Sequence, residues 1–388
     1  MKPNVVVRER GRERARGGHP WIYRSDVAEV RAGGGDVVEV IGPRGRKLGE
    51  ALYSDRSEIA VRMLVRGERA FDRHALEARI DAAIALRERL AIDATAYRLV
   101  HAEGDDLPSL IVDRYGDVLV VQALSQGMDR LLPEVVGILG ERLGPAGILA
   151  RNDVRARSLE GLERNVEVLA GDVPDAVVVR ERGLEIEVDL RSGQKTGRFL
   201  DQRENRSAAA GYARGRVLDC FSYDGGFALE LAPSATDVVA IDLSERAVAG
   251  TRANAARNRL ANVDARVANA FDFLRDAERS GERYDTIVLD PPAFAKNRAS
   301  LPKALAGYKE INLRALKILN PGGILVTSSC SYHVSEATLV EVVRAAAADA
   351  HARLSVLEKR TQSRDHPILL QVPETYYLKC LILRKLEG

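Results

Sequence analysis

The chain has 388 residues, of which 46% are hydrophobic and 29% are charged. This length and composition allow two or three domains with buried cores and exclude a disordered tail protein. Lysine and arginine number 58 and the acidic residues 56, so the net charge is only +2. A nucleic-acid partner therefore has to be inferred from clustered charges rather than from their total.

The three cysteines, Cys220, Cys330 and Cys380, are far apart and have neither metal-ligand spacing nor a disulfide pattern. No apolar run approaches the ~20 residues that a membrane span requires. Met1-Lys2-Pro3 is followed by valines and then arginines, which is not the order of a signal peptide. We therefore expect a soluble cytoplasmic protein without a bound metal ion and without a membrane partner.

Residues 1–72 are predicted to form a small β-barrel domain. Segments 36–41 and 59–64 are rich in β-branched residues and lie between glycines, which is typical of short strands. A basic stretch with six arginines lies between residues 8 and 24, together with Trp21, the only tryptophan of the chain. Clustered arginines bind phosphates, so we expect this stretch to face RNA; a solvated, partly disordered tail is the alternative.

Residues 73–182 are predicted to form a middle α+β domain. Leu76, Ile80 and Leu90 belong to a helical repeat of apolar residues that begins near residue 71. A second helix is expected at residues 128–143, with strands at 109–113, 118–123 and 147–150. The region has no combination of residues typical of catalysis, so we expect a structural or RNA-facing role.

Residues 183–388 are predicted to form an α/β domain. Short apolar strands are expected at residues 217–219, 238–241, 265–268, 286–289 and 324–328. Helical stretches separate them, and this alternation is typical of an open, mainly parallel sheet. Ligands of such sheets bind at the carboxyl ends of the strands, so the residues directly after each strand are the candidates for a site.

The first three of these strands end in residues suited to a nucleoside. The first leads into Gly225-Gly226, a pair that lets the backbone approach a ligand, although alone it is equally typical of a tight turn. Asp242 ends the second strand, where a carboxylate can accept hydrogen bonds from two ribose hydroxyls. Asn269 ends the third and can contact an adenine amino group, while Phe271 can cover the ring. The three-glycine dinucleotide fingerprint is absent, which counts against a nicotinamide oxidoreductase.

The fourth and fifth strands end in residues that indicate nucleic-acid chemistry. The prolines of Asp290-Pro291-Pro292 remove backbone donors and fix φ, so the loop should be rigid with Asp290 at its base. This tripeptide is typical of nucleic-acid methyltransferases. Cys330 follows the fifth strand among serines, at the edge that should hold the ligand, and is our candidate nucleophile. Cys220 and Cys380 are expected to be inert core residues.

Segments along nearly the whole chain together resemble the bacterial 23S rRNA 5-methylcytosine methyltransferases that carry an N-terminal PUA domain. They occur in the same order and comprise residues 19–23, 193–203, 220–227, 290–292, 329–331 and 365–367. Two positions depart from the family pattern. Asp224 stands where threonine is common and Asn269 where aspartate is common, and both keep a polar side chain.

The resemblance implies a fold and a cofactor. The fold would be a Rossmann-like class I methyltransferase domain at residues 183–388, behind a PUA-like barrel and the middle α+β domain. The cofactor would be S-adenosylmethionine. The implied cofactor-binding residues are Lys195, Phe199, Gln202, Phe221, Tyr223, Gly225, Gly226, Asp242, Asn269, Phe271 and Asp290. Lys195 could equally be an ordinary solvated lysine.

The resemblance also implies a covalent mechanism with which the residues agree. Cytosine C5 takes a methyl group only after a thiolate has added to C6, and Cys330 would supply that thiolate. An ordinary thiol has a pKa near ~8.5, so its surroundings would have to lower it. Asp290 is the candidate for binding the amino edge of cytosine. The base that removes the C5 proton is not assigned by the sequence.

The implied substrate is 23S ribosomal RNA, single-stranded or partly unfolded, because the target base must leave its stack. An N-methyltransferase on the same scaffold is one alternative; such enzymes use an Asp-Pro-Pro-aromatic loop and need no cysteine, but here Ala293 takes the aromatic position. A non-catalytic RNA-binding protein with a decayed methyltransferase domain is another. The oligomeric state stays open, with a homodimer as one option.

Overall fold

The computed structural model describes residues 2–295 and 298–387, and their contacts divide into two compact units. The first unit comprises Met1–Arg182, Val188–Leu200 and Arg364–Thr375, and the second comprises Gly183–Glu187, Asp201–Ser363 and Tyr376–Gly388. Within the described residues no helix is long and apolar enough to cross a membrane.

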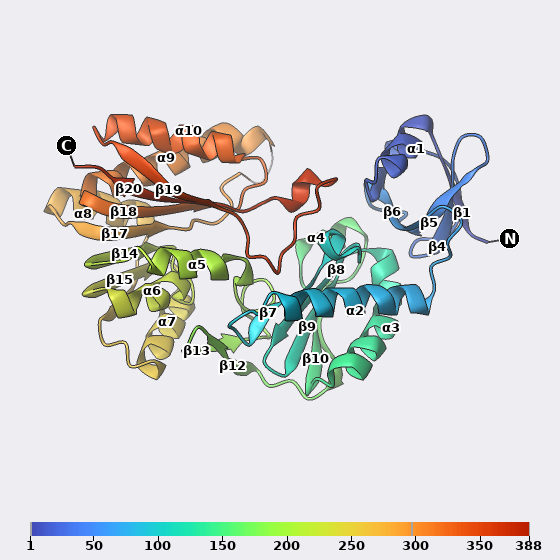
Figure 1. Cartoon of the computed structure of the whole chain (residues 1–388), viewed down its shortest axis with the longest axis horizontal. Helices are drawn as coiled ribbons and strands as arrows, with labels where there is room; N and C mark the ends of the chain where they lie inside the picture. Colours follow the sequence, from blue (N-terminus) through green and yellow to red (C-terminus); the bar gives the residue numbers. More distant parts are fainter. Residues whose placement is uncertain (1, 296–297, 388) are drawn as a thin grey trace. The chain divides into compact units, whose positions relative to one another are not determined.

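The N-terminal part of the first unit is a small β-domain (Figure 1). Its strands are β1 (Asn4–Val7), β2 (Trp21–Tyr23), β3 (Val27–Arg31), β4 (Val37–Ile41), β5 (Lys47–Tyr53) and β6 (Ile59–Arg66), in the order β2-β6-β5-β4-β1-β3. Alternate residues such as Val38 and Val40 are buried in one core, as the period of two requires. Gly49 has φ +152°, and a Cβ there would lie 1.9 Å from the Val65 carbonyl oxygen, so only glycine fits this irregular strand pairing.

The basic stretch forms a helix, α1 (Glu9–Arg16), so the alternative of a disordered tail is wrong. Part of its charge is paired: Arg14 lies 3.3 Å and Arg10 3.6 Å from carboxylate oxygens of the buried Asp26. Arg8, Arg10 and Arg16 are exposed to solvent. The other three arginines of the stretch are partly buried.

A second sheet lies further along the first unit. Its strands are β7 (Ala96–His101), β8 (Leu110–Tyr115), β9 (Val118–Ala123), β10 (Gly147–Arg151) and β11 (Val166–Gly171), in the order β11-β10-β9-β8-β7. The expected helices are present as α2 (Arg73–Arg89) and α3 (Gln126–Leu143), followed by the short α4 (Arg155–Leu159). Asp72 and Ser125 cap α2 and α3 by accepting from backbone N–H groups, which explains why the helices begin there. Strands β12 (Ala176–Glu181) and β13 (Leu184–Asp189) follow.

The second unit is built on an α/β sheet, as expected. Its strands are β14 (Arg216–Cys220), β15 (Asp237–Asp242), β16 (Val263–Val267), β17 (Tyr284–Leu289), β18 (Leu319–Ser329), β19 (Leu354–Arg360) and β20 (Lys379–Lys385), in the order β16-β15-β14-β17-β18-β20-β19. Strands β14 to β18 pair in parallel, whereas β20 is antiparallel to both of its neighbours. The chain leaves β14 first toward β15 and later returns to pair β17 on the other side. The carboxyl ends of β14 and β17 therefore flank the point where ligands bind in such sheets.

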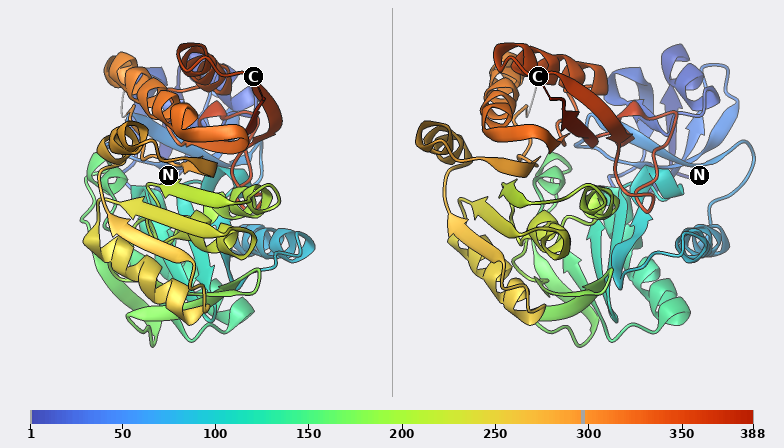
Figure 2. Two further views of the ribbon diagram at one scale, coloured as in Figure 1. Left: turned by 90° about the vertical axis from the view of Figure 1, so that its left-hand side faces the viewer. Right: turned by 60° about the vertical axis from the view of Figure 1, so that its left-hand side comes forward.

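Helices cover both faces of this sheet (Figures 1 and 2). On one side are α5 (Arg203–Ala210), α6 (Gly226–Leu231) and α7 (Glu245–Arg257), and on the other α8 (Ala270–Ser280), α9 (Leu301–Ile318) and α10 (Glu336–Asp349). Successive strand residues serve opposite faces: Val217 packs in the core under α6 and Leu218 in the core under α9. Burial on both faces explains why these strands are continuously apolar in sequence.

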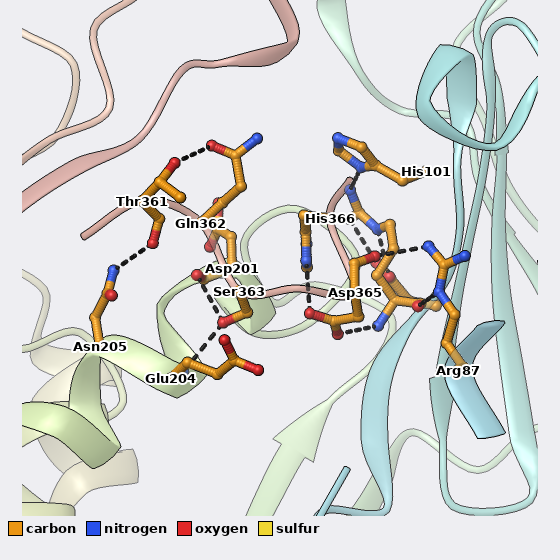
Figure 3. Close-up of polar contacts among 12 residues, drawn as sticks. Arg87, His101, Asp201, Glu204, Asn205, Thr361, Gln362, Ser363, Asp365 and His366 are labelled. Carbon is orange, nitrogen blue, oxygen red and sulfur yellow. Dashed lines mark hydrogen bonds and ion pairs between the residues drawn. The ribbon is translucent and has the colours of Figure 1, made fainter. Parts of the chain in front are cut away.

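The first unit encloses a buried charged network around the return segment Arg364–Thr375 (Figure 3). Asp365 accepts from the backbone N–H of Arg98 at 2.9 Å, and its carbonyl oxygen accepts from Arg87 at 2.7 Å. His366 lies 3.0 Å from the Asp365 carboxylate and its ring centroid 5.1 Å from that of His101. Burial, with the neighbouring His366, Arg98 and Arg87, holds the pKa of His101 well below its usual value, so this ring is neutral. The Asp365-His366-Pro367 segment of the sequence thus completes a core.

Arg98 and Asp113 form a buried ion pair of this network, with bonds of 2.6 and 2.8 Å, and Thr196 also donates to Asp113. We expect Asp113→Asn to lower the free energy of unfolding by about 3–5 kcal/mol, because a buried guanidinium would lose its counter-charge. Urea unfolding followed by the fluorescence of Trp21, which lies in the same unit, measures this. The matched control is Asp93→Asn, which breaks an exposed pair with Arg180 and should cost less than about 1 kcal/mol. Equal losses in both variants would contradict the prediction.

Candidate active site

The loop between β14 and α6 is tightly bent. Phe221, Tyr223 and Gly225 all have positive φ, at 64°, 49° and 80°. A Cβ at Gly225 would lie 2.6 Å from Cγ2 of Thr251, so the position accepts only glycine. Thr251 donates from its hydroxyl to the Tyr223 carbonyl at 3.0 Å and fixes the loop from α7. Gly226 is buried as the first residue of α6. The predicted glycine pair therefore lets the backbone pass close to Thr251, at the point where the strand order of the sheet reverses.

Asp242 ends β15 and holds this loop. Its Oδ2 accepts from the Tyr223 N–H and its Oδ1 from the Ser244 N–H, both at 2.9 Å. Each carboxylate oxygen has a second acceptor site, so Asp242 can still accept from two hydroxyls of a ligand. The side chain thus combines a structural role with the predicted capacity for binding a ribose.

Asp219, inside β14, was not singled out by the sequence reasoning. Its Oδ2 accepts from the Ala228 N–H at 2.9 Å, whereas its buried Oδ1 has no hydrogen-bond partner among the described residues. Burial raises the pKa of Asp219 well above its usual value, and the nearby carboxylates of Asp290, Asp242 and Asp224 raise it further. Carboxylates gathered in this way favour a cationic ligand. The sequence did contain a signal for Asp219, namely a carboxylate within an otherwise apolar strand. A buried charge requires a partner, so such a residue is a candidate for a site.

Asn269 caps helix α8. Its Oδ1 accepts from the N–H groups of Phe271 at 2.9 Å and Asp272 at 3.4 Å. This orientation turns the amide NH₂ group away from the helix, and that group is a donor. Asn269 is therefore more complementary to an adenine ring nitrogen than to the amino group that we expected it to contact.

Aromatic rings from two loops and from the first turn of α8 pack together beside Asn269. The ring centroids of Phe221 and Phe271 are 6.5 Å apart, and Phe294 lies 6.4 Å from the first and 6.0 Å from the second. Phe294 also contacts Tyr308 of α9 at 4.8 Å. Phe294 comes from the Asp-Pro-Pro loop, and its ring anchors that loop in the core under α8 and α9.

Asp290 follows β17 at the end of a chain of hydrogen bonds. Gln202 donates from Nε2 to Oδ1 of Asp290 at 2.8 Å, and Asn205 donates to Oε1 of Gln202 at 2.6 Å. Arg360 in turn donates to Asn205 at 3.0 Å, and Asn205 also donates to the Thr361 carbonyl (Figure 3). Because each partner fixes the next, the Asp290 carboxylate is held in one orientation. Gln202, predicted to help close the cofactor site, lies beside Asp290.

Cys330 follows β18, directly beside the strand that ends in Asp290, because Leu289 pairs with Thr327. It is partly exposed, whereas Cys220 and Cys380 are fully buried. Burial raises the pKa of Cys220 well above its usual value and that of Cys380 to about 12, so both remain thiols. Of the three cysteines, Cys330 is therefore the one suited to react with a ligand.

Lys195 and Phe199 belong to the first unit, whereas the other predicted cofactor residues belong to the second. The two side chains contact each other, with the Lys195 ammonium 4.6 Å from the centroid of the Phe199 ring. Lys195 is exposed and has a positive φ of 55°. The contact is a cation–π interaction that holds the two residues together.

Comparison with known proteins agrees with this geometry. Residues 5–66 match a PUA-like domain, and residues 98–384 match the S-adenosylmethionine-dependent methyltransferases. Ribosomal RNA large subunit methyltransferase I of Tolumonas auensis is 40% identical over 377 residues, which cover 94% of this chain and 95% of that protein. The protein of the same name from Shewanella denitrificans is 40% identical over 395 residues, covering 99% and 98%. The chain belongs to this family of S-adenosylmethionine-dependent methyltransferases.

A solved structure of similar fold is the methyltransferase SMU.776 complexed with SAH. It has a TM-score of 0.84 at 22% identity and covers 98% of this chain and 99% of that one, so the fold is shared over nearly the full length. The expected PUA-like N-terminal domain, methyltransferase domain and cofactor are confirmed.

The described residues of the methyltransferase fit S-adenosylmethionine, which carries a sulfonium, an ammonium group, a ribose diol and adenine. The unpartnered Asp219 Oδ1 and the carboxylates around it suit the positive charges. Asp242 can accept from the diol. Among the described residues, no group of three or more His, Cys, Asp or Glu side chains is arranged to hold a metal ion.

We expect Asp242→Ala to weaken S-adenosylmethionine binding by ~1.5–3 kcal/mol, which is roughly a 10- to 150-fold rise in Kd, because a charged acceptor is lost. Calorimetric titration of the intact protein measures this change. Asp272→Ala removes an exposed carboxylate near the same sheet edge, where it pairs with Arg275, and should leave the Kd unchanged. An unchanged Kd for Asp242→Ala would show that the ribose is bound elsewhere.

Proposed function

We propose that this methyltransferase transfers a methyl group to C5 of a cytosine in large-subunit (23S) ribosomal RNA. The observation that supports this most is Cys330: a partly exposed thiol at the end of β18, beside the strand that presents Asp290. The relatives named ribosomal RNA large subunit methyltransferase I and the PUA-like domain support the RNA substrate. The target base must leave its stack to reach the sheet edge, so we propose single-stranded or partly unfolded RNA.

The proposed reaction begins with the Cys330 thiolate. Its sulfur forms a bond to C6 of cytosine, and the electron pair of the C5–C6 double bond makes C5 nucleophilic. S-adenosylmethionine, when bound, would supply an electrophilic methyl group to C5, and its sulfur would keep the electron pair of the broken S–CH₃ bond. Loss of the C5 proton to a base then restores the double bond and releases the thiolate. Asp290, held by Gln202, accepts from the cytosine amino group and orients the ring.

The proposed cofactor site uses the residues expected from the sequence together with Asp219. Asp242 accepts from the ribose hydroxyls, Asn269 donates to adenine, and Phe271 lies against its ring. The backbone of Phe221, Tyr223, Gly225 and Gly226 and the side chains of Gln202 and Asp290 complete the proposed set.

An N-methyltransferase is the second candidate function, and the Asp-Pro-Pro loop argues against it. Such an enzyme stacks the target base on the aromatic residue of this loop. Here Ala293 occupies that position, and Phe294 is packed between Phe221, Phe271 and Tyr308. Stacking on Phe294 would require the cluster to open. A non-catalytic RNA-binding protein is disfavoured because the buried Oδ1 of Asp219, which has no hydrogen-bond partner among the described residues, would then have no ligand to bind.

The exposed arginines of the PUA-like domain should bind RNA phosphates. We expect the combined variant Arg8→Ala, Arg10→Ala and Arg16→Ala to weaken binding of 23S rRNA fragments. The slope of log K against log salt should become less steep by about 2–3, because each lost phosphate contact releases one fewer counterion. Filter binding between 50 and 200 mM salt measures the slope, and S-adenosylmethionine affinity should not change.

The matched control for this charge loss changes three other exposed arginines to alanine: Arg266, Arg279 and Arg344 of the second unit. If both triple variants reduce the slope equally, the effect is one of total charge, and α1 is not an RNA-binding helix.

The covalent step can be tested with large-subunit rRNA transcribed with 5-fluorocytidine in place of cytidine. Fluorine at C5 cannot leave as a proton does, so the bond between Cys330 and C6 should persist and join protein to RNA. A denaturing gel should show the adduct for the natural protein, Cys220→Ala and Cys380→Ala. Cys330→Ala should show none and should still bind S-adenosylmethionine. If Cys330→Ala methylates RNA at the normal rate, the C5 assignment is wrong and N-methylation replaces it.

A further inference from the structure

A buried lysine lies behind the proposed nucleophile. Lys379 begins β20, is 2% exposed and stands opposite Ser329 in the antiparallel pair with β18. Its Nζ donates to the Ser331 carbonyl at 2.7 Å and to the Tyr377 carbonyl at 2.9 Å. Burying an ammonium group is costly, and cofactor binding does not require one here. The position of Lys379 therefore calls for an explanation.

The charges that face Lys379 are few. In the described part of the chain no carboxylate lies within ion-pair distance of its ammonium group, which bonds to two neutral carbonyls. Burial lowers the pKa of Lys379 to about 8, and the Cys330 thiolate acts in the opposite direction. Because Nζ of Lys379 bonds the carbonyl of Ser331 and Lys379 pairs with Ser329, its charge lies beside Cys330, where it favours the thiolate over the thiol.

Asp290 follows the adjacent strand β17, and a further titratable neighbour of Cys330 is Tyr308 of α9. Its hydroxyl lies 3.0 Å from Oγ of Ser329 and 3.1 Å from Oγ of Ser331, so it holds the residues on both sides of Cys330. Burial raises the pKa of Tyr308, which keeps the phenol neutral. Tyr308 therefore fixes the backbone around Cys330 without adding charge, whereas Lys379 fixes the same backbone and adds a positive charge.

We propose that Lys379 is the positioning residue that keeps Cys330 in its thiolate form. The ammonium group favours the anion, the thiol proton leaves to solvent, and the two carbonyl bonds prevent Lys379 from turning away. The inference rests on the proposed function, because it gives Lys379 a purpose only if Cys330 is the nucleophile. It assigns activation of the thiol to a residue of β20, which lies almost fifty residues after Cys330 in the sequence.

The test measures thiolate formation in the full-length protein without RNA. Iodoacetamide reacts with the thiolate, and mass spectrometry of the Cys330 peptide gives the alkylation rate between pH 6 and 10; Cys220 and Cys380 are buried and serve as internal references. We expect Lys379→Met and Lys379→Gln to react at least tenfold more slowly at pH 7, with the midpoint of the pH profile moved upward by about one unit or more. Lys379→Arg keeps the charge and should stay near the natural rate.

Lys385→Met is the matched control. Lys385 lies on the same strand and also donates to two carbonyls, those of Leu316 and Leu319, and burial lowers its pKa as well. Its loss perturbs β20 in the same manner without removing a charge beside Cys330, so the Cys330 pH profile should not move. Glutamine at position 379 keeps hydrogen-bond donors without the charge, which separates anchoring from electrostatics.

The inference is overturned if Lys379→Gln reacts at the natural rate with an unmoved pH midpoint, since anchoring alone would then suffice. It is also overturned if Lys385→Met moves the midpoint as far as Lys379→Met does. S-adenosylmethionine affinity of each variant verifies that the second unit is folded. A failure of the proposed function has a different signature: Cys330→Ala would continue to methylate RNA, whatever the alkylation rates of the lysine variants.

Discussion

The parallel pairing of β14 with β15 on one side and β17 on the other is the constraint on which the site depends. It places the carboxyl ends of strands that are distant in sequence at one edge and leaves a gap above the reversal point. Within that arrangement, few hydrogen bonds are needed to fix the loops of the site. Asp242 ties the glycine loop to β15, and Gln202 fixes Asp290 at the end of β17. The helices on both faces bury the sheet so completely that only the strand ends remain available for chemistry.

The electrostatics of this edge set two requirements against each other. Asp242 and Asp290 gather negative charge around the buried Asp219, which suits a cationic cofactor but disfavours a thiolate nearby. The proposed C5 methylation needs both the cation and the thiolate at one edge. In this proposal Lys379 meets the second requirement, because its charge acts on the thiol while the carboxylates act on the cofactor. Lys379 is the first residue of β20 and lies opposite Ser329 at the end of β18, because the two strands are antiparallel. In a strand parallel to β18, the first residue would lie at the other end of β18.

Much of the second unit could be predicted because its signals are local. Apolar runs with a polar residue at each end gave the strands, and Asp242, Asn269, Asp290 and Cys330 all stand where strand ends were expected. The features that the sequence did not reveal depend on contacts between residues that are distant in the chain. The bond from Gln202 to Asp290 spans 88 positions, and Lys379 meets Cys330 only because β20 inserts between β18 and β19. Asp219 appeared to be part of a core strand, since only the structure reveals that one oxygen is buried without a partner.

The chain path also explains why one segment that resembles the family, Asp365-His366-Pro367, contributes to the core of the first unit. After Ser363 the chain leaves the second unit, contributes Arg364–Thr375 to the first and returns at Tyr376. Asp365 fills a position that the backbone of Arg98 and the side chain of Arg87 both require, and Thr196 of another returning segment bonds to Asp113. The first unit is therefore incomplete without residues that follow the methyltransferase glycine loop in sequence. A protein cut after residue 182 would leave Arg98 and Asp113 without these partners, so the first unit is complete only when the later segments of the chain have been added to it.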